Sequence, residues 1–345
     1  MKAITIRRFG SPSVLELRDY PEPEPSEHDV VIEVRASGLN FAEVMARKGL
    51  YPDAPKAPCV VGYEASGIVE KVGSSVTAFR PGDSVIALCH FGAHAEKVCV
   101  PEALVLAMPQ GMNFEQGAAL PVNYLTAHHI LFQVAALRPK ERVLIHMAGG
   151  GVGMAAIQLC RTIEGVELFG TASAAKRAMI REAGCDHVID YRKIDYADEI
   201  KRLTQGQGVD VVMDALGGRD WKKGFDLLRP AGRLVAFGFA NLSKQGGRHI
   251  VHVLGELMRI PRFSPMTLMD HNRSVAGVNM GHLWSHRDLL VGEMDHLFKL
   301  FTQGKIAPNI DKCFAFSEAA DAHRYLEERK NIGKVLLIPD RFSKS

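Results

Sequence analysis

The stretch that decides the fold is Arg142-Val-Leu-Ile-His-Met-Ala-Gly-Gly-Gly-Val-Gly-Met-Ala-Ala-Ile-Gln-Leu-Cys160. An apolar run enters a turn of small residues at 148–153, and a run of small and apolar residues leaves it as a helix. In the spacing A-x-G-x-x-G, small residues let the backbone bend and approach a diphosphate, and the helix N-terminus offers it free N–H groups. The segment predicts a dinucleotide-binding turn, with a purely structural tight turn as the alternative. No G-K-[ST] follows, so a triphosphate-binding P-loop is not indicated.

Downstream of this turn, predicted strands and helices alternate to about residue 280. We expect strands at Arg142–Met147, Val166–Gly170, His187–Asp190, Val209–Leu216, Arg233–Phe239 and Ser274–Asn279. Helices are expected between the first five, at Val152–Thr162, Ala174–Ala183, Tyr196–Thr204 and Trp221–Leu228, and Gly184 is expected to stop the second. Regular alternation of this kind predicts an α/β fold, a doubly wound parallel sheet with helices on both faces.

The end of the second predicted strand indicates which dinucleotide binds. There the chain reads Leu168-Phe-Gly-Thr-Ala-Ser-Ala-Ala-Lys-Arg177, without the acidic residue that would hold the ribose hydroxyls of NAD. A hydroxyl at Ser173 and cations at Lys176 and Arg177 suit a 2′-phosphate, which a carboxylate would repel. The sequence therefore favours NADPH over NADH. In the alternative interpretation, Lys176 and Arg177 lie on an ordinary solvent-exposed face of a helix and bind no phosphate.

The flanking segments differ from this pattern. Short strands at Val30–Ala36, Ser66–Gly73 and Asp83–Leu88, separated by proline-rich turns, predict a small β-barrel or sandwich. Near the end, Ser317 is expected to cap a helix that runs to about Glu328, and Lys334–Ile338 to form a last strand.

Composition excludes several classes of protein. The 345 residues suggest roughly two domains, and 47% hydrophobic with 23% charged residues is ordinary globular usage. A net charge of +3 without basic runs argues against a nucleic-acid partner. Six cysteines without a C-x-x-C pair indicate reduced thiols, and with no secretory signal at the N-terminus we expect a cytoplasmic protein. Gly117–Leu137 lacks charged side chains but holds several polar ones, so we do not expect it to span a membrane.

These parts, in this order, resemble the medium-chain dehydrogenase/reductase superfamily, and within it the zinc-independent quinone oxidoreductase branch. The residues that carry the resemblance are Gly38–Glu43, Lys48–Pro52, Val61–Glu64, Tyr124–Ala127 and the glycine turn. Those more similar to the vesicle-amine-transport-like members are His146–Ala156, Phe169–Ser173, Ile189–Tyr191 and Asn331–Leu337. The resemblance implies a GroES-like β-rich catalytic domain (1–122, with a return over 281–345), a Rossmann NADP-binding domain (123–280), and a homodimer.

No catalytic metal is expected. The zinc-dependent relatives carry a cysteine where this chain has Asn40 and a histidine where it has Tyr63, and neither Asn nor Tyr is a usual zinc ligand. Glu64 alone does not make a metal site. We expect His90 and His94 to be surface or turn histidines.

The resemblance also implies roles for individual residues. Gly150, Gly151, Val152 and Gly153 would line the pyrophosphate; Ser173, Lys176 and Tyr191 would meet the 2′-phosphate side; Thr126 would lie near the nicotinamide ribose or pyrophosphate; Phe239 and Ala240 would lie beside the nicotinamide; Asn40 and Tyr51 would face the substrate. Alternatives stay open for three of them. Tyr191 as a strand-end aromatic, Thr126 as a helix cap and Tyr51 as a wall of the cleft are the simpler interpretations.

The function that these residues favour is NADPH-dependent hydride transfer to a small apolar quinone or conjugated enone. Without zinc, the developing oxyanion needs other hydrogen-bond donors, and Asn40 and Tyr51 are the candidates. A membrane-associated or lipid-binding protein that keeps the nucleotide fold with little catalysis is the alternative.

Two further segments are candidates for a contact surface, and the sequence does not decide what they contact. Val253–Met269 contains three methionines and two arginines, and fits a pocket wall, a dimer surface or a lipid contact, of which we favour the pocket. Its two prolines argue against one long helix. Val235–Phe239 is expected near the sheet edge at which two subunits would join.

Overall fold

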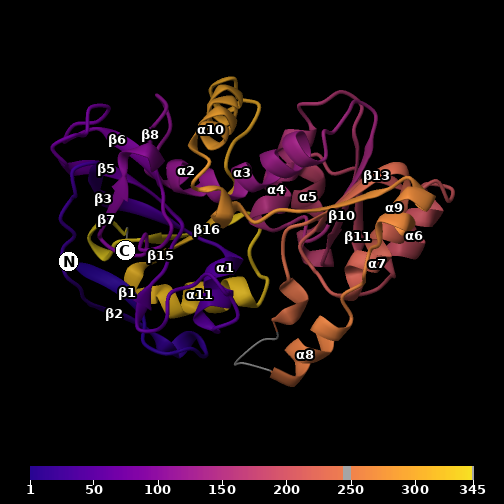
Figure 1. Cartoon of the computed structure of the whole chain (residues 1–345), viewed down its shortest axis with the longest axis horizontal. Helices are drawn as coiled ribbons and strands as arrows, with labels where there is room; N and C mark the ends of the chain where they lie inside the picture. The colour runs from indigo at the N-terminus through magenta and orange to yellow at the C-terminus, as the bar shows by residue number, and fades with distance from the viewer. Residues whose placement is uncertain (244–249, 344–345) are drawn as a thin grey trace. The chain divides into compact units, whose positions relative to one another are not determined.

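The computed structural model describes residues 1–243 and 250–343, and these form two units (Figure 1). One unit comprises residues 1–125 and 281–343, and the other comprises 126–243 and 250–280. The first unit is rich in β-strands and the second is built on a parallel sheet, so the predicted fold class is confirmed. No helix among the described residues is both long and apolar enough to cross a membrane.

The second unit is built on a six-stranded parallel sheet in the order β11-β10-β9-β12-β13-β14. Its strands are β9 (Arg142–Ile145), β10 (Glu167–Ala172), β11 (His187–Asp190), β12 (Val209–Asp214), β13 (Leu228–Ala236) and β14 (Ser274–Gly277). Its helices include α4 (Gly151–Cys160), α5 (Arg177–Glu182, after the turn η4 at Ala174–Lys176), α6 (Tyr196–Leu203) and α7 (Arg219–Asp226). All six predicted strands and all four predicted helices are present; His187–Asp190 matches at both ends, and the others have shifted ends. The strand order reverses between β9 and β12, where α/β sheets bind ligands.

The sequence of each element explains its place in this sheet. Every residue of β12 is buried, as expected for a strand whose two faces are both covered. Gly184 has φ +109° directly after α5, which confirms it as the residue that stops this helix. Val235–Phe239, expected near the sheet edge, begins on β13, which is one strand in from the edge, and β14 pairs with β13 and forms the edge itself.

The first unit contains two sheets and returns to its N-terminal strands at the end of the chain. The smaller sheet has the order β2-β1-β4, and the larger has β15-β16-β3-β5-β6-β8 with β7 on β3. Their strands are β1 (Lys2–Ile6), β2 (Leu15–Asp19), β3 (Asp29–Leu39), β4 (Cys59–Val60), β5 (Glu64–Val72), β6 (Ser84–Leu88), β7 (Lys97–Pro101), β8 (Val105–Ala107), β15 (Ile310–Ala315) and β16 (Lys334–Ile338). The longer helices are α1 (Phe41–Arg47), α2 (Phe114–Ala119), α3 (Pro121–His128), α10 (Arg287–Thr302) and α11 (Ala319–Glu327). The short helical turns of this unit are η1 (Pro12–Val14), η2 (Glu102–Leu104), η7 (Phe316–Glu318) and η8 (Asp340–Phe342). Helix α3 and the turn η6 (Met280–Leu283) cross from one unit into the other, and η3 (His129–Val134) and η5 (Ala240–Leu242) belong to the second unit.

One predicted helix start is wrong. Ser317 does not cap the helix near the end of the chain, because it lies inside η7, and α11 begins at Ala319. The backbone N–H and hydroxyl of Ser317 both donate to Asp340, at 3.0 and 3.2 Å. The Asp340 carboxylate thus engages the Ser317 hydroxyl that would otherwise cap the helix.

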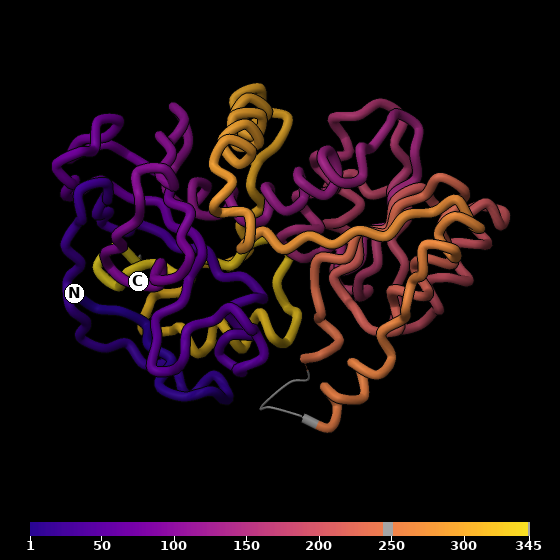
Figure 2. The backbone as a smooth tube through the Cα atoms, viewed as in Figure 1, coloured from indigo at the N-terminus to yellow at the C-terminus, as the bar shows by residue number. Residues whose placement is uncertain are grey.

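Helices α8 (Ile250–Met258) and α9 (Pro265–His271) occupy the segment whose role the sequence left open. Figure 2 shows the backbone turning between them before it extends into β14. Ser264 caps α9 by accepting the N–H of Thr267 at 3.1 Å, and Pro265 takes its first position, so the prediction of no single long helix is confirmed. Met258 is 89% exposed and Met266 is 80% exposed. Within this unit, therefore, several of the segment's apolar side chains face outward.

Candidate functional site

The glycine-rich turn leads directly from β9 into α4. Met147 takes a left-handed conformation at φ +54°, and its carbonyl accepts the N–H of Gly150 at 2.8 Å. Gly150 is the N-cap of α4, and the first hydrogen bond within the helix runs from Met154 N–H to Gly150 O at 2.9 Å. The N–H groups of residues 151–153 precede that bond, so they point out of the helix at its positive end. This is the geometry that holds a diphosphate.

Glycine is required at this turn because the backbone comes too close for side chains. A Cβ at Gly153 would lie 2.6 Å from the carbonyl oxygen of Ala148, and one at Gly150 would lie 3.2 Å from that of Met147. A Cβ at Gly149 would lie 2.8 Å from Cδ of Lys176, so the lysine stem packs against the turn. The turn therefore has a small-residue surface with one cation beside it, and these residues fit a dinucleotide.

The residues predicted to meet the 2′-phosphate come from two neighbouring strand ends. Ser173 follows β10 and Tyr191 follows β11, and the strands pair in register from Phe169 with His187 to Ala172 with Asp190. Lys176 is half-buried in η4. Tyr191 is 40% exposed, with the guanidinium of Arg192 at 5.9 Å from its ring centre. The structure thus brings Ser173 and Tyr191 to one edge of the sheet.

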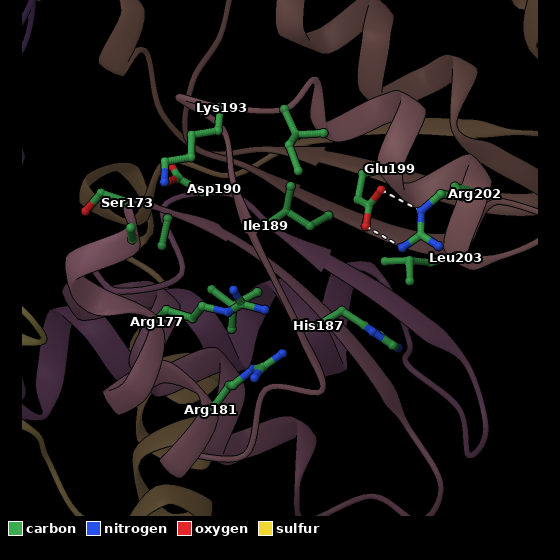
Figure 3. A pocket seen from close by; sticks show the side chains of 14 residues that line it. Ser173, Arg177, Arg181, His187, Ile189, Asp190, Lys193, Glu199, Arg202 and Leu203 are labelled. Carbon is green, nitrogen blue, oxygen red and sulfur yellow. Dashed lines mark hydrogen bonds and ion pairs between the residues drawn. The ribbon is translucent and has the colours of Figure 1, made fainter.

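A hollow of about 320 Å³ lies along the edge strand β11 and adds Arg181 and Lys193, which the sequence did not single out, to the predicted cation Arg177 (Figure 3). Ser173 and Lys193 line it, together with Arg177 and Arg181 from α5. Figure 3 shows the two α5 arginines side by side along the hollow. On α6, Arg202 is already bound to Glu199, at 2.7 and 2.8 Å. The i, i+4 spacing of Arg177 and Arg181 is the signal that could have revealed this surface.

Three further cofactor candidates lie in different surroundings. Thr126 is buried well inside α3, so its alternative interpretation as a helix cap is wrong. Phe239 is 40% exposed and packs edge-on against Trp221, with ring centres 4.9 Å apart. Ala240 is only 3% exposed, and its N–H donates to the carbonyl of Ala215 at 2.9 Å. Of the latter two, Phe239 has the exposed surface that contact with a nicotinamide needs.

In the first unit, Asn40 lies in a network of charged groups. It is the N-cap of α1, and its side-chain N–H groups donate to Glu64 at 3.0 Å and to Glu43 at 3.3 Å. Its carbonyl oxygen accepts from the ammonium of Lys334 at 2.6 Å. Lys334 also donates to Glu64, and Lys334 and Glu64 are both buried. The amide of Asn40 is therefore engaged on both sides by neighbours in its own unit.

This network does not fit a zinc ion. An ammonium already supplies the positive charge beside Glu64, and the second oxygen of Glu64 accepts the backbone N–H of Val122 at 2.7 Å. Across residues 1–243 and 250–343, no three His, Cys, Asp or Glu side chains gather as a metal site would need. The sequence predicts His94 at the surface or in a turn. It lies at a bend before β7 and is fully buried, with Nε2 at 3.1 Å from the carbonyl oxygen of Gly38, so the surface alternative is wrong.

Glu43 is the group in this network that titrates near neutral pH. Its side chain is buried and accepts the backbone N–H of Asn40 at 2.9 Å, completing a capping box at the start of α1. Burial raises the pKa of Glu43 to about 7, with the negative charge of Glu64 adding to the rise and Lys334 opposing it. With two carboxylates and one ammonium enclosed together, the protonated form of Glu43 balances the charge.

Tyr51 is half-buried and packs against the core of the first unit. Its ring meets that of Tyr63 edge-on, with centres 6.1 Å apart. Tyr63, whose position is histidine in zinc-dependent relatives, is 6% exposed. Its burial raises the pKa of the Tyr63 hydroxyl far above the usual value, so this hydroxyl stays protonated. A catalytic role for Tyr51 stays a prediction.

Family comparisons match both units. A model described as the alcohol dehydrogenase GroES-like domain matches residues 26–110, and one described as zinc-binding dehydrogenase matches residues 183–337.

Individual relatives match nearly the whole chain. The synaptic vesicle membrane protein VAT-1 homolog of Rattus norvegicus is 44% identical over 341 residues, which cover 98% of this chain and 84% of that protein. A quinone oxidoreductase of Pseudomonas aeruginosa is 36% identical over 341 residues, covering 98% and 99%. The crystal structure of Escherichia coli quinone oxidoreductase complexed with NADPH matches with a TM-score of 0.87 at 30% identity, covering 98% of this chain and 100% of that one.

The close approach at Gly153 generates a prediction. We expect Gly153→Ala to weaken NADPH binding by about tenfold or more, because the added methyl group forces α4 away from the Ala148 carbonyl. Gly292→Ala in α10 is the matched control, since no atom lies within 4 Å of its added Cβ, and it should leave affinity unchanged. Calorimetric titration with NADPH measures both. Equal affinity in the two variants would contradict the assignment of the turn.

The burial of Glu43 generates a pH prediction. Because its folded pKa of about 7 exceeds the ordinary 4.5, the folded state holds a proton that the unfolded state releases. That stabilisation is complete below pH 4.5 and is lost as the pH rises through 7, at a cost of about 3 kcal/mol. Glu43→Gln keeps the capping geometry without the charge, so we expect it to match the wild type at pH 5 and to exceed its stability at pH 8.

Urea unfolding at the two pH values measures this difference. Glu318→Gln, at an exposed capping-box glutamate before α11, is the control and should show no such pH dependence relative to the wild type. A Glu43→Gln effect of the same size at both pH values would show that Glu43 does not take up the proton.

Proposed function

This chain belongs to the medium-chain dehydrogenase/reductase superfamily, in its quinone oxidoreductase branch of enzymes, and we propose that it transfers a hydride from NADPH to a quinone or conjugated enone without zinc. The single observation that carries the proposal is the turn at 148–153, where glycines leave room for a diphosphate and α4 begins with free N–H groups. The Escherichia coli relative, described as a complex with NADPH, supports the choice of cofactor.

Different residues of the chain bind different parts of the cofactor. The N–H groups of Gly151, Val152 and Gly153 bind the diphosphate, and the ammonium of Lys176 and hydroxyl of Ser173 bind the 2′-phosphate. NADPH, when bound, supplies the hydride, and the protein supplies orientation and electrostatics. Preference for the phosphorylated cofactor rests on the absence of a carboxylate after β10, together with the cations on η4 and α5.

On the substrate side, Asn40 and Tyr51 remain the proposed contacts. Both N–H groups of the Asn40 amide already donate to carboxylates, so a substrate oxygen would have to displace one of those hydrogen bonds. A substrate that needs little help with its developing charge therefore suits this chain. A quinone meets that requirement, because its reduced oxygens are delocalised and accept protons from water.

A homodimer is part of the proposal. The parallel sheet ends in β11 on one side and β14 on the other, and we assign sheet extension between two copies to Ser274–Gly277 of β14, the edge next to the strand that holds Val235.

One observation favours the second candidate, a membrane-associated or lipid-binding protein with little catalysis. Met258, Met266 and Met269 are 75–89% exposed on α8 and α9, and Arg259 and Arg262 lie in the loop between them. Methionine with arginine is a composition that suits a lipid surface.

The enzyme proposal is tested by turnover. We expect purified protein to oxidise NADPH with simple quinones such as benzoquinone and naphthoquinone, and more slowly with conjugated enones, in assays that follow NADPH absorbance with and without a chelator. The chelator should change nothing. Tight NADPH binding with no turnover across both substrate classes would defeat the enzyme proposal and favour the second candidate.

Cofactor preference is tested at Lys176. We expect Lys176→Ala to weaken NADPH binding about 10- to 100-fold, the loss of one charge-assisted phosphate contact, and NADH binding by less than about threefold. Lys201→Ala, at an exposed lysine of α6, is the control for removing a positive charge. An equal loss for both cofactors would place Lys176 away from the 2′-phosphate.

A further inference from the structure

His146 and Asp214 form a fully buried pair of titratable groups that the proposed reaction does not use. His146 directly follows β9 and Asp214 ends β12, so both lie at the carboxyl edge of the sheet, where the strand order reverses. Neither side chain has any exposed surface, and Nε2 of His146 lies 3.9 Å from Oδ2 of Asp214. The pair therefore lies at the place where this fold binds its ligand.

The two facing atoms lack hydrogen bonds although the rest of each side chain is engaged. Nδ1 of His146 lies 3.1 Å from Oγ1 of Thr171, and Oδ1 of Asp214 accepts the backbone N–H groups of Leu216 and Gly217 at 2.7 and 2.9 Å. Among residues 1–243 and 250–343, neither Nε2 of His146 nor Oδ2 of Asp214 has a partner. A separation of 3.9 Å is too long for a direct hydrogen bond between them.

Each member of the pair is tied to a different turn. On the His146 side, Oγ1 of Thr171 accepts the N–H of Met147 at 3.3 Å, and the Thr171 carbonyl accepts that of Ala148 at 3.1 Å, so the glycine-rich turn is fastened here. On the other side, Asp214 fastens the turn that contains Gly217 and Gly218, at φ +79° and +64°. Closing the gap between the pair would link the two turns.

The polar and charged groups around the pair are engaged with partners of their own. The ring of Tyr196 lies edge-on to His146 at 4.7 Å, and its hydroxyl donates to Asp220 at 2.9 Å. The ammonium of Lys223 lies 4.1 Å from the centre of that ring and pairs with Asp195. Asn241 donates to the second oxygen of Asp220 at 2.8 Å.

Burial acts on both members of the pair. It lowers the pKa of His146, against the pull of Asp214, and it raises the pKa of Asp214, against the pull of His146. Burial thus disfavours any net charge on the pair. A ligand that brings negative charge to the turn disfavours a net negative charge on His146 and Asp214 in particular.

We propose that His146 and Asp214 take up one proton when the diphosphate of a dinucleotide binds at the glycine-rich turn, and that this proton joins Nε2 to Oδ2 and locks the two turns together. The inference rests on the proposed cofactor site. The proton comes from solvent; with His146 neutral and Asp214 ionised beforehand, the pair changes from a net charge of −1 to 0. Both are positioning residues, since they act on the cofactor through the turns.

Proton uptake is measured by calorimetric titration of the full chain with NADPH in phosphate and in Tris, whose ionisation enthalpies differ. NADH is titrated in parallel because it lacks the 2′-phosphate. Proton uptake by that phosphate is thereby separated from proton uptake by the pair. We expect uptake of up to one proton with both cofactors, and affinity that falls by up to about tenfold per pH unit where the pair titrates. Asp214→Asn and His146→Gln should abolish the uptake and flatten the pH dependence. His282→Gln, at an exposed histidine 2.9 Å from Asp53, should retain both.

The outcomes separate the inference from the function on which it rests. NADPH binding without proton uptake in the wild type, or with the same uptake in both pair variants, overturns the inference and leaves the proposed function standing. Absence of NADPH binding overturns both. Nitrogen NMR of the His146 ring in the wild type, with and without NADPH, gives the same decision if the variants do not fold: an unchanged protonation state overturns the proposal.

Discussion

The second unit depends on the contact between the Ala148 carbonyl and the bare Cα of Gly153. It lets α4 start immediately beside the end of β9, with its first N–H groups uncovered. The left-handed Met147 and the packing of Lys176 against Gly149 follow from the same tight path of the backbone. A larger turn would place a side chain where the proposed diphosphate would lie, and the cation beside it would have no fixed position. The binding surface is thus a consequence of backbone geometry more than of any functional group.

Buried charge is handled differently in the first unit. A lone buried ammonium is costly, and Lys334 is enclosed with Glu64, Asn40 and Glu43 so that its charge is balanced and its hydrogen bonds are satisfied. Replacing such a group by apolar residues often leaves stability unchanged, so stability alone does not account for its presence. Here the network fixes the N-cap of α1 and joins it to β16, which comes from the far end of the chain.

Local patterns allowed much of this structure to be predicted. The alternation of strands and helices, the glycine turn and the stop at Gly184 each depend on residues close in sequence, and each is present. Long-range partners could not be predicted. Lys334 lies 294 residues from Asn40, and Asp340 takes Ser317 away from its expected cap. His94 is buried because Gly38 accepts its hydrogen bond across 56 positions of the sequence. These errors share one cause, since sequence spacing carries no information about which distant group supplies a polar partner.

The two buried clusters show how this chain manages charge with protons and an ammonium. In the first unit, the ammonium of Lys334 lies beside Glu64, and the proton on Glu43 removes the excess negative charge. In the second, His146 and Asp214 face each other across a gap that a proton would close. Each cluster therefore changes its net charge by one when a single proton binds or leaves, with no metal ligand set required. A hydride acceptor whose product oxygens are protonated by water fits such a protein, because the chain then has to orient the reactants and does not have to stabilise a full alkoxide charge.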